Sequence, residues 1–405
     1  MRRQPRAFRG GTRAHARALA RGAVLAVGLL VLADAAHATS AVGGARLAGS
    51  GVVVELGPGA LAPPETDAAS YVVADLATGE ILAAKSAHER LPPASTLKVL
   101  TALTLLPELD KDQVVVGTDE EMFVEGSKVG VAAGLSYSVD LLFKGMLIDS
   151  GNDATHALAR VAGGVERTVA AMNTLALELQ ALDTVAVDPS GLDEPGQLTS
   201  AYDLALIARA ALERDDFRTY VITPTADLPT HDGTTYQIQN GNRLLGSYDG
   251  LIGVKNGYTT LARHTYIGAA ERGERAYLVT VMRTEGRAET VAAALLDWAF
   301  LNADAVEPVG ALVEPQPVPI ASASPEASAS APPAEPGATP APDAAPAAAA
   351  DGGLGAMATV GLVGVGVVGA IAGLRIRAVR RERLRRERLR QDPRRQPSHA
   401  AGRRA

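Results

Sequence analysis

Ser95 and Lys98 stand three residues apart, and this spacing is suited to nucleophilic catalysis. On a helix, two such residues share one face, with Cβ atoms about 5–6 Å apart. A serine hydroxyl becomes an effective nucleophile when a base removes its proton, and burial or nearby positive charge can lower the pKa of a lysine enough for that role. The helix N-terminus would also offer backbone N–H groups to a developing oxyanion.

The same spacing also fits a capping serine beside a solvated lysine. Residues 95–106 favour the catalytic interpretation, because they form an apolar segment between Pro93 and Pro107 and predict a buried helix. A helix of this kind would bury Lys98, and a buried lysine normally has a function.

Two further short motifs carry groups suited to the same chemistry. Ser150-Gly151-Asn152 lies between helices expected over 138–148 and 152–162, and it supplies a hydroxyl for proton relay and an amide for holding a peptide. A glycine turn capped by Asn152 is the alternative. Lys255-Asn256-Gly257 opens an expected strand, where a lysine would attract a carboxylate and the glycine would let a substrate backbone come close.

The elements around these motifs predict an α+β domain. Strands are expected at 71–75 and 81–84 near the start of the body, and at 250–254, 265–270 and 277–282 near its end. Helices are expected between them, one of them at 202–212 capped by Thr199-Ser200, and a last helix at 288–302 contains Trp298. Strands from both ends of the body would then form one sheet.

In combination, the three motifs resemble those of the penicillin-recognising serine enzymes. The surrounding sequence resembles the low-molecular-mass D-Ala-D-Ala carboxypeptidases over about 67–303. The segments that carry this resemblance are Tyr71–Leu82, Pro93–Ala102, Ser150–Ala154, Gly191–Asp193, Thr199–Leu212 and Gly253–Thr259. The resemblance implies a β-lactamase/transpeptidase-like domain at 67–305, in which helices flank an antiparallel sheet.

The resemblance also implies a role for each residue of the site. Ser95 would be the nucleophile and Lys98 its base, while Ser150 and Asn152 relay protons and hold the peptide. Lys255, Asn256 and Gly257 would bind substrate, and the N–H groups of Ser95 and Tyr258 would form the oxyanion hole. Arg283 matches an arginine near the terminal carboxylate of the substrate, with a surface salt bridge as the alternative. The implied substrates are peptidoglycan stem peptides and the implied inhibitors are β-lactams, with no metal or cofactor.

Two features depart from the family pattern. The central residue of the K-x-G triad usually carries a hydroxyl, and here it is Asn256. An amide can also donate a hydrogen bond to a carboxylate, so the departure is compatible with activity but puts substrate specificity and β-lactam affinity in question. The chain also runs almost directly from the Trp298 helix into a Pro-rich segment, so the second β domain of some relatives is not expected.

Membrane signals are expected at both ends of the chain. Residues 1–38 combine seven arginines, the apolar run Ala23–Leu32 and a small-x-small site at Ala36–Ala38, which predicts a signal peptide, with an uncleaved anchor as the alternative. Residues 353–374 predict a spanning helix and 375–405 an Arg-rich cytoplasmic tail; a Gly/Ala-rich segment that never inserts is the alternative. Between them lie an exported segment (39–66), the catalytic domain and an Ala/Pro/Ser-rich stalk (306–352). The enzyme would be a single-pass membrane protein with its catalytic domain outside the cell.

Composition excludes several classes of function. The net charge is −6, but residues 39–374 hold 19 basic and 41 acidic residues, a balance of −22 that argues against nucleic-acid binding. The absence of cysteine excludes disulfides, thiolate metal sites and a cysteine nucleophile.

Three rival functions remain open from the sequence. A serine β-lactamase shares the motifs, but Glu166, the nearest acid after Ser150, lacks a matching context. A non-catalytic wall-binding protein with this fold would explain Asn256. A Ser-His-Asp hydrolase is disfavoured because no G-x-S-x-G motif is present, and His88, His156, His231 and His264 are expected at the surface or satisfied in the core.

Overall fold

A computed structural model describes residues 41–317 of the chain. The signal peptide, spanning helix and cytoplasmic tail predicted at 1–38, 353–374 and 375–405 lie outside these residues. Among the helices of residues 41–317, none has the length and apolar character needed to cross a membrane.

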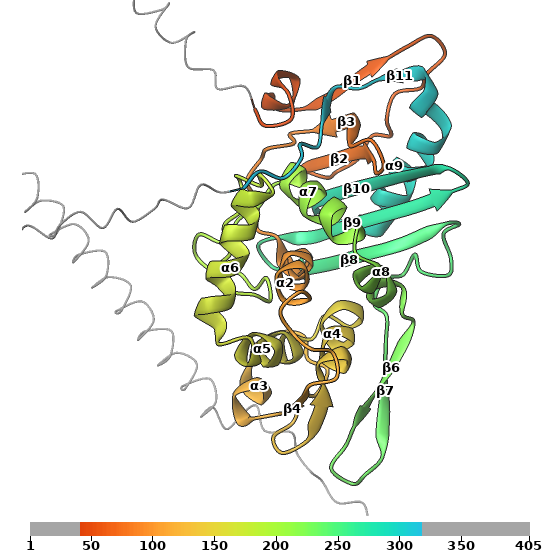
Figure 1. Cartoon of the computed structure of the whole chain (residues 1–405). Coiled ribbons are helices and arrows are strands. Elements are labelled where there is room, and N and C mark those ends of the chain that lie inside the picture. Colours follow the sequence, from red (N-terminus) through yellow and green to blue (C-terminus); the bar gives the residue numbers. More distant parts are fainter. Residues whose placement is uncertain (1–40, 318–405) are drawn as a thin grey trace, which may run out of the picture. The chain divides into compact units, whose positions relative to one another are not determined.

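An antiparallel sheet forms the centre of the domain and interleaves strands from both ends of the described chain (Figure 1). Its order is β11–β1–β3–β2–β10–β9–β8, with β12 paired to β3. The bounds are β1 Val52–Leu56, β2 Ser70–Asp75, β3 Glu80–Lys85, β8 Leu251–Thr259, β9 Arg263–Arg272, β10 Arg275–Thr284, β11 Val306–Glu307 and β12 Gly310–Ala311. Because β2 pairs with β10, from Ser70 opposite Met282 to Asp75 opposite Tyr277, the predicted joining of the two ends is confirmed.

Both faces of this sheet are buried, which explains the continuous apolar run in β2. Side chains alternate along a strand, so Tyr71 and Val73 face one core and Val72 and Ala74 face the other. The first core lies under α9 (Ala288–Asn302), where Trp298 is buried. The second core continues into the helices on the opposite face. The predicted α+β class is therefore confirmed, with helices on both faces of the sheet.

The helices of the second face surround α2 (Figure 1). Their bounds are α2 Lys98–Leu105, α3 Asp119–Phe123, α4 Val139–Ile148, α5 Asn152–Val161, α6 Val165–Glu178, α7 Ala201–Leu212 and α8 Asp215–Ile222. Ser200 caps α7 as predicted, because its side chain accepts a hydrogen bond from the Asp203 N–H. Two small hairpins complete the domain: β4 (Val114–Val116) with β5 (Ser136–Ser138), and β6 (Thr225–Pro229) with β7 (Thr235–Gln239).

The helix predicted over 95–106 begins differently from the expectation. Residues Ala94–Leu97 form a 3₁₀ turn, and the α-helix itself starts at Lys98. Ala94 adopts a left-handed backbone with φ of 50°. Gly191 passes so close to this turn that a Cβ on it would lie 2.0 Å from the Ala94 carbonyl oxygen. The turn is therefore set by a tertiary contact that helix periodicity does not reveal.

The folded domain extends beyond the predicted bounds of 67 and 305. At the N-terminal side, β1 pairs with β3, and at the C-terminal side β11 and β12 pair with β1 and β3. Val306, Val309 and Leu312 are buried there, although the local composition was interpreted as the start of a stalk. This segment joins the domain with three buried apolar side chains because β1 and β3 supply hydrogen-bonding partners for its backbone.

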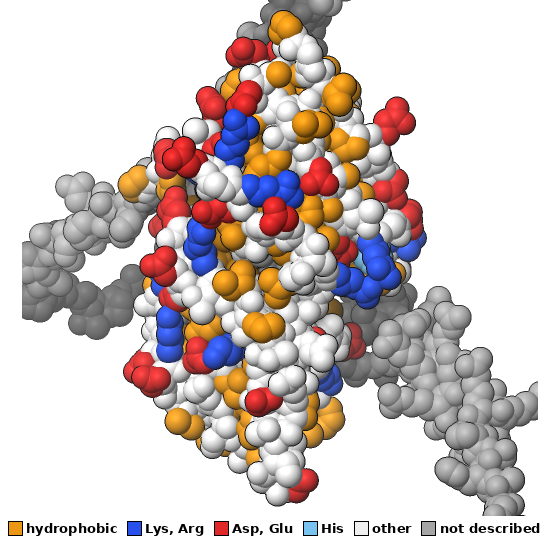
Figure 2. Space-filling view, turned by 90° about the vertical axis from the view of Figure 1, so that its right-hand side faces the viewer, with side chains coloured by type: hydrophobic (Ala, Val, Ile, Leu, Met, Phe, Trp, Pro, Cys, Tyr) orange, Lys and Arg blue, Asp and Glu red, His pale blue; other side chains and the backbone are white. Residues whose placement is uncertain are grey.

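Charge on the described surface is dispersed into local pairs. On the face drawn in Figure 2, acidic and basic side chains are interspersed with hydrophobic ones, and one group of basic side chains gathers at the right-hand edge. Arg272 pairs with Asp249 and Asp297, and Arg214 pairs with Asp216.

Candidate active site

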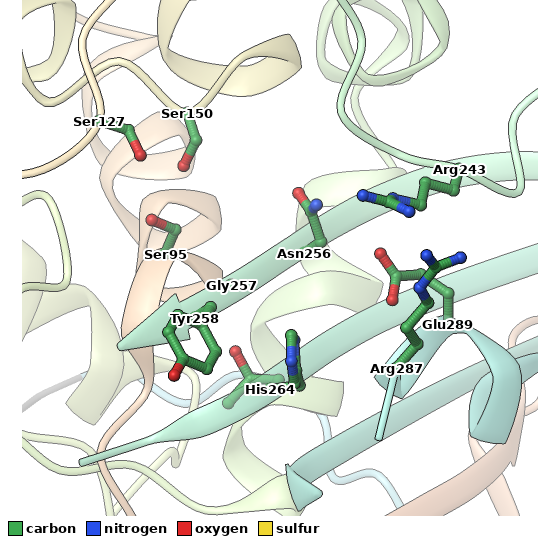
Figure 3. Close-up of a pocket in the computed structure, with 11 residues that line it drawn as sticks. Ser95, Ser127, Ser150, Arg243, Asn256, Gly257, Tyr258, His264, Arg287 and Glu289 are labelled. Atoms are coloured by element: carbon green, nitrogen blue, oxygen red, sulfur yellow. The ribbon is translucent and has the colours of Figure 1, made fainter. Parts of the chain in front are cut away.

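The candidate site is a pocket of about 310 Å³ where the edge strand β8 meets the start of α2. Strand, helix and loop elements that are far apart in sequence all contribute to it (Figure 3). Its lining residues are Ser95, Ser127, Ser150, Arg243, Asn256, Gly257, Tyr258, His264, Thr265, Arg287 and Glu289. The pocket therefore collects residues from all three predicted motifs.

Lys98 lies directly behind Ser95 and is fully buried. Its Nζ lies 3.1 Å from the Ser95 Oγ, 2.7 Å from the Asn152 Oδ1 and 2.6 Å from the Ser190 carbonyl oxygen. A neutral amine could donate to two of these oxygens and keep its lone pair for the third. This geometry is compatible with transfer of the Ser95 proton to Lys98, which stays a prediction.

The electrostatic surroundings favour the neutral form of this lysine. Burial is the largest cause that lowers the pKa of Lys98 well below its ordinary value, and the charge of Lys255 lowers it further. The carboxylates of Asp188 and Asp153 act in the opposite direction and are outweighed. Burial disfavours the charged ammonium form because the low-dielectric interior does not replace the hydration that this charge has in water.

Ser150 and Asn152 have different positions relative to the pocket. The Ser150 Oγ is buried without a hydrogen-bond partner among residues 41–317, and it points toward Ser95 in Figure 3. Asn152 is buried outside the lining, where its Nδ2 donates to the Glu125 carbonyl oxygen and its Oδ1 accepts from Lys98. Ser150 is thus placed to relay a proton. Asn152 contacts Lys98 and can hold it in place, while its role in holding the peptide stays a prediction.

Asp153 fixes the segment that brings Ser127 into the pocket. Its buried carboxylate accepts hydrogen bonds from the backbone N–H groups of Val129, Gly130 and Val131 at 2.7–3.0 Å. Ser127 just precedes this segment and lines the pocket beside Ser150. Ser127 was not predicted, since a lone serine far from the motifs carries no sequence signal.

Close contacts explain why position 257 of β8 is a glycine. A Cβ at this position would lie 2.6 Å from the Thr265 Oγ1 and 2.8 Å from the Ser95 backbone nitrogen. The strand therefore passes directly alongside the nucleophile, and the next residue, Tyr258, lines the pocket. This approach supports the predicted oxyanion hole formed by the N–H groups of Ser95 and Tyr258, which stays a prediction.

Lys255 and Asn256 do not both face the pocket. Lys255 is buried behind the strand, and its Nζ donates to the carbonyl oxygen and the Oδ1 of Asn256. Burial lowers the pKa of Lys255 to about 8. Asn256 lines the pocket itself. Lys255 thus acts on the site through its charge and through Asn256, and not by lining the cavity.

Two arginines that were not predicted line the pocket, and the predicted Arg283 does not. Arg243 comes from the loop after β7, and Arg287 immediately precedes α9. Their guanidinium groups gather with the Glu289 carboxylate at one end of the pocket (Figure 3). Arg283 lies in the irregular end of β10 with a φ of 52°. The sequence suggested Arg283 as the carboxylate-binding residue because it follows an expected strand. In the structure, the turn into α9 brings Arg287 to the pocket instead.

The family model described as D-alanyl-D-alanine carboxypeptidase (Peptidase_S11) matches residues 59–286. The chain belongs to this family. The match contains all three motifs, and the activity of the family is serine-type D-alanyl-D-alanine carboxypeptidase, so the predicted enzyme class is confirmed.

Curated relatives and solved structures agree with this family assignment. The D-alanyl-D-alanine carboxypeptidase DacB2 of Mycobacterium tuberculosis is 42% identical over 249 residues, covering 60% of this chain and 85% of the relative. DacD of Escherichia coli is 36% identical over 273 residues, covering 64% and 69%. A crystal structure of a D-alanyl-D-alanine carboxypeptidase from M. tuberculosis superposes with a TM-score of 0.60 at 40% identity, covering 63% of this chain and 99% of that chain. The Streptomyces K15 DD-transpeptidase superposes with a TM-score of 0.56 at 28% identity, covering 60% and 100%.

The residues raised for rival enzymes differ in their position relative to the pocket of this S11 peptidase. Glu166 lies in the first turn of α6 and lines a different cavity with Glu120 and His156. His264 does line the active-site pocket, contrary to expectation, and its ring stacks against that of Tyr258 with centroids 4.7 Å apart. His88 and His156 contact Asp183 and Asp188, as expected for satisfied histidines.

Proposed function

We propose that this enzyme removes the terminal D-alanine from peptidoglycan stem peptides through an acyl-serine intermediate. Lys98 accepts the Ser95 proton while the Oγ attacks the penultimate D-alanine carbonyl carbon. The resulting tetrahedral oxyanion is stabilised by backbone N–H groups of Ser95 and Tyr258. The C–N bond then breaks, the amine leaves with a proton relayed through Ser150, and water hydrolyses the acyl ester to regenerate Ser95.

The observation that carries this proposal is the buried Lys98 with its Nζ between the Ser95 Oγ and the Asn152 Oδ1. It gives the nucleophile a base without a histidine, a metal or a cofactor taking part in the step. The other end of the pocket supplies charge complementarity, because Arg243 and Arg287 would bind the terminal carboxylate of the leaving D-alanine. β-Lactams carry a carboxylate at a comparable distance from their reactive carbonyl, so they would acylate Ser95 as inhibitors.

The rival functions find less support in the pocket. Rapid β-lactam hydrolysis in class A enzymes depends on a carboxylate near the nucleophile, and Glu166 lines another cavity. Among the described lining residues, the carboxylate is that of Glu289, which Figure 3 shows at the arginine end and away from Ser95. A non-catalytic binding protein would have no need of the Lys98 arrangement.

We further propose that the enzyme works outside the cell, exported by residues 1–38 and anchored by a spanning helix at 353–374. The support is the uncharged apolar run followed by the arginine-dense segment after Leu374. Protease added to intact cells should remove the catalytic domain and leave residues 375–405 protected. Protection of the catalytic domain in intact cells would contradict this topology.

The decisive experiment treats the full-length protein and Ser95→Ala with a fluorescent penicillin and with a D-Ala-D-Ala peptide. We expect labelling and D-alanine release from the wild-type protein, and neither from the variant. Labelling without D-alanine release would keep the nucleophile and reject the proposed substrate. The absence of both, in a protein with a cooperative melting transition, would reject the enzymatic proposal.

A further inference from the structure

The side chain of Asn256 bridges two parts of the active site, and its two partners determine its orientation. The Lys255 Nζ can only donate, so it must contact the Asn256 Oδ1, at 3.1 Å. The Gly241 carbonyl oxygen can only accept, so it must contact the Asn256 Nδ2, also at 3.1 Å. The amide is therefore occupied by the protein on both sides.

Gly241 extends this bridge across the pocket. Its N–H donates to the carbonyl oxygen of Ile148 at 2.7 Å. Ile148 is the last residue of α4, two positions before Ser150. A single residue, Gly241, thus connects the edge strand β8 through its C=O group with the helical wall that presents Ser150 through its N–H group.

The same loop carries the carboxylate-binding end of the pocket. Arg243 follows Gly241 by two residues and lines the pocket. The loop is also held from behind, because the buried Asn242 Oδ1 accepts a hydrogen bond from Tyr266 at 2.8 Å. With Asn242 held to β9 and Gly241 held to β8, the backbone before Arg243 has little freedom.

We propose that Asn256 is a positioning residue, whose amide couples the K-x-G strand to the Arg243 loop and to the end of α4. The hydroxyl found at this position in the family pattern has one oxygen on a shorter side chain, so it lacks the separate acceptor and donor atoms that contact Lys255 and Gly241 here. Asn256 therefore acts on substrate through Arg243 and pocket width. This inference rests on the proposed function, because Arg243 is taken to bind the terminal carboxylate.

A double-mutant cycle tests whether Asn256 acts through Arg243. In the full-length protein, we expect Asn256→Ala to raise the KM for a D-Ala-D-Ala peptide about tenfold, with a smaller change in kcat. In the Arg243→Ala background, the same substitution should add less than about twofold, because the positioned group is gone. An equal effect in both backgrounds would overturn the proposal and assign Asn256 a direct substrate contact.

Hydrogen exchange at the Gly241 amide tests the bridge independently of activity. We expect exchange at least about tenfold faster in Asn256→Ala, because the carbonyl group of Gly241 then loses the hydrogen bond from the Asn256 Nδ2 that holds this residue against β8. Gln237→Ala is the matched control, since it removes an exposed side-chain amide from the neighbouring β7. Unchanged exchange in the Asn256 variant would overturn the bridge.

A second variant and a second readout keep the test of Asn256 independent of a folding defect and of the proposed function. Asn256→Ser, with a small polar side chain, replaces Asn256→Ala if the latter fails to melt cooperatively. If the wild-type protein releases no D-alanine, the proposed function fails, but the cycle is then measured as the rate of acylation by a fluorescent penicillin. Additive effects on that rate would overturn the positioning role in the same way.

Discussion

Two buried lysines, Lys98 and Lys255, lie close enough for the charge of Lys255 to lower the pKa of Lys98. Burial is the largest cause of the lowered pKa of Lys98, and the charge of Lys255 comes next. Lys255 itself keeps a pKa of about 8 because Asp149 and Glu289 partly offset its burial. Two positive charges in one buried region are costly, and the neutral form of Lys98 relieves that cost.

This relationship predicts the pH dependence of acylation. Lys98 can accept a proton only when it is neutral, so the rate should rise as pH increases through its folded-state pKa. Lys255→Met removes the neighbouring charge, which raises the pKa of Lys98. The rising limb of the plot of acylation rate against pH should therefore shift to higher pH. The check is the acylation rate by fluorescent penicillin from about pH 5 to 10, with Lys144→Met as the control at a partly exposed lysine. A limb that stays in place or moves to lower pH would contradict the coupling.

Removal of the base itself should reduce acylation far more than it reduces stability. We expect Lys98→Met to lower the acylation rate about 10²–10⁴-fold, the usual contribution of a general base. The substitution removes a buried amine but also takes a hydrogen bond from the Asn152 Oδ1 and from the Ser190 carbonyl oxygen, so its two effects on the melting temperature oppose each other. A rate within about tenfold of the wild-type value would show that another group deprotonates Ser95.

The close approach of β8 to the nucleophile predicts a strong effect of one methyl group. Gly257→Ala should push the strand away from Ser95 and reduce both acylation and stability, the latter by about 1–3 kcal/mol as for other overpacked sites. Gly49→Ala is the matched control, since a Cβ there has no neighbour within 4 Å. Stopped-flow acylation and urea unfolding would measure the two effects. A Gly257→Ala enzyme with the wild-type acylation rate would show that the strand can move without consequence.

The two candidate arginines can be separated by substitution. Arg287 lines the pocket and Arg283 does not, so Arg287→Ala should raise the KM for a D-Ala-D-Ala peptide about 10–100-fold, as expected for loss of a charged hydrogen bond. Arg283→Ala should change it less than about threefold. Steady-state kinetics on both variants decide the matter, and a larger effect at Arg283 would favour the sequence-based prediction.

A buried cluster away from the active site predicts how stability depends on pH. His88 contacts Asp183 through its Nδ1 at 2.7 Å, and the Asp203 Oδ2 accepts a hydrogen bond from Thr184. Burial raises the pKa of Asp203 from 3.8 to about 7. For His88, burial lowers the pKa but the hydrogen bond and charge of Asp183 outweigh it, so the net direction is upward.

Both shifts have the same sign for stability. A raised folded-state pKa stabilises the protein below the unfolded-state pKa, and this contribution disappears as pH rises through the folded value. The melting temperature should therefore fall as pH rises from the ordinary Asp203 pKa of 3.8 to its folded value of about 7, and His88 should extend the fall above pH 6.5. In the Asp203→Asn variant, residue 203 is neutral at every pH, so the melting temperature should fall less with rising pH. The Asp232→Asn variant, with its change on an exposed loop, should keep the wild-type fall. Equal pH slopes in the wild type and Asp203→Asn would contradict the assignment.

The motifs could be predicted from sequence because each depends on local spacing. Ser95 and Lys98 share a helical face by periodicity alone, and the apolar residues that follow already imply that the lysine is buried. The strands around Val72 and Leu278 were recognisable because both faces of a central strand are apolar. Ser200 was recognisable as a cap from its residue type and its place before a helical pattern.

The remainder depended on contacts between distant segments. Arg243 and Arg287 carry no local signal that separates them from Arg283, since any of the three is a charged residue near a strand or helix end. The start of α2 at Lys98 reflects the approach of Gly191 to Ala94. The segments before 67 and after 305 have weak local preference, and they joined the domain because the edges of the sheet offered unpaired backbone groups.

The sequence by itself therefore predicted the enzyme family, the fold class and the candidate pair Ser95 and Lys98, because these depend on residue type and on periodicities of a few residues. Only the tertiary structure decided what surrounds them: the charge of Lys255 behind Lys98, the pair of arginines at the carboxylate end, and the use of the Asn256 amide by Lys255 and Gly241. The physical reason is that electrostatic and hydrogen-bonding partners are chosen by distance in space, and the chain brings those partners together only when the sheet and helices pack.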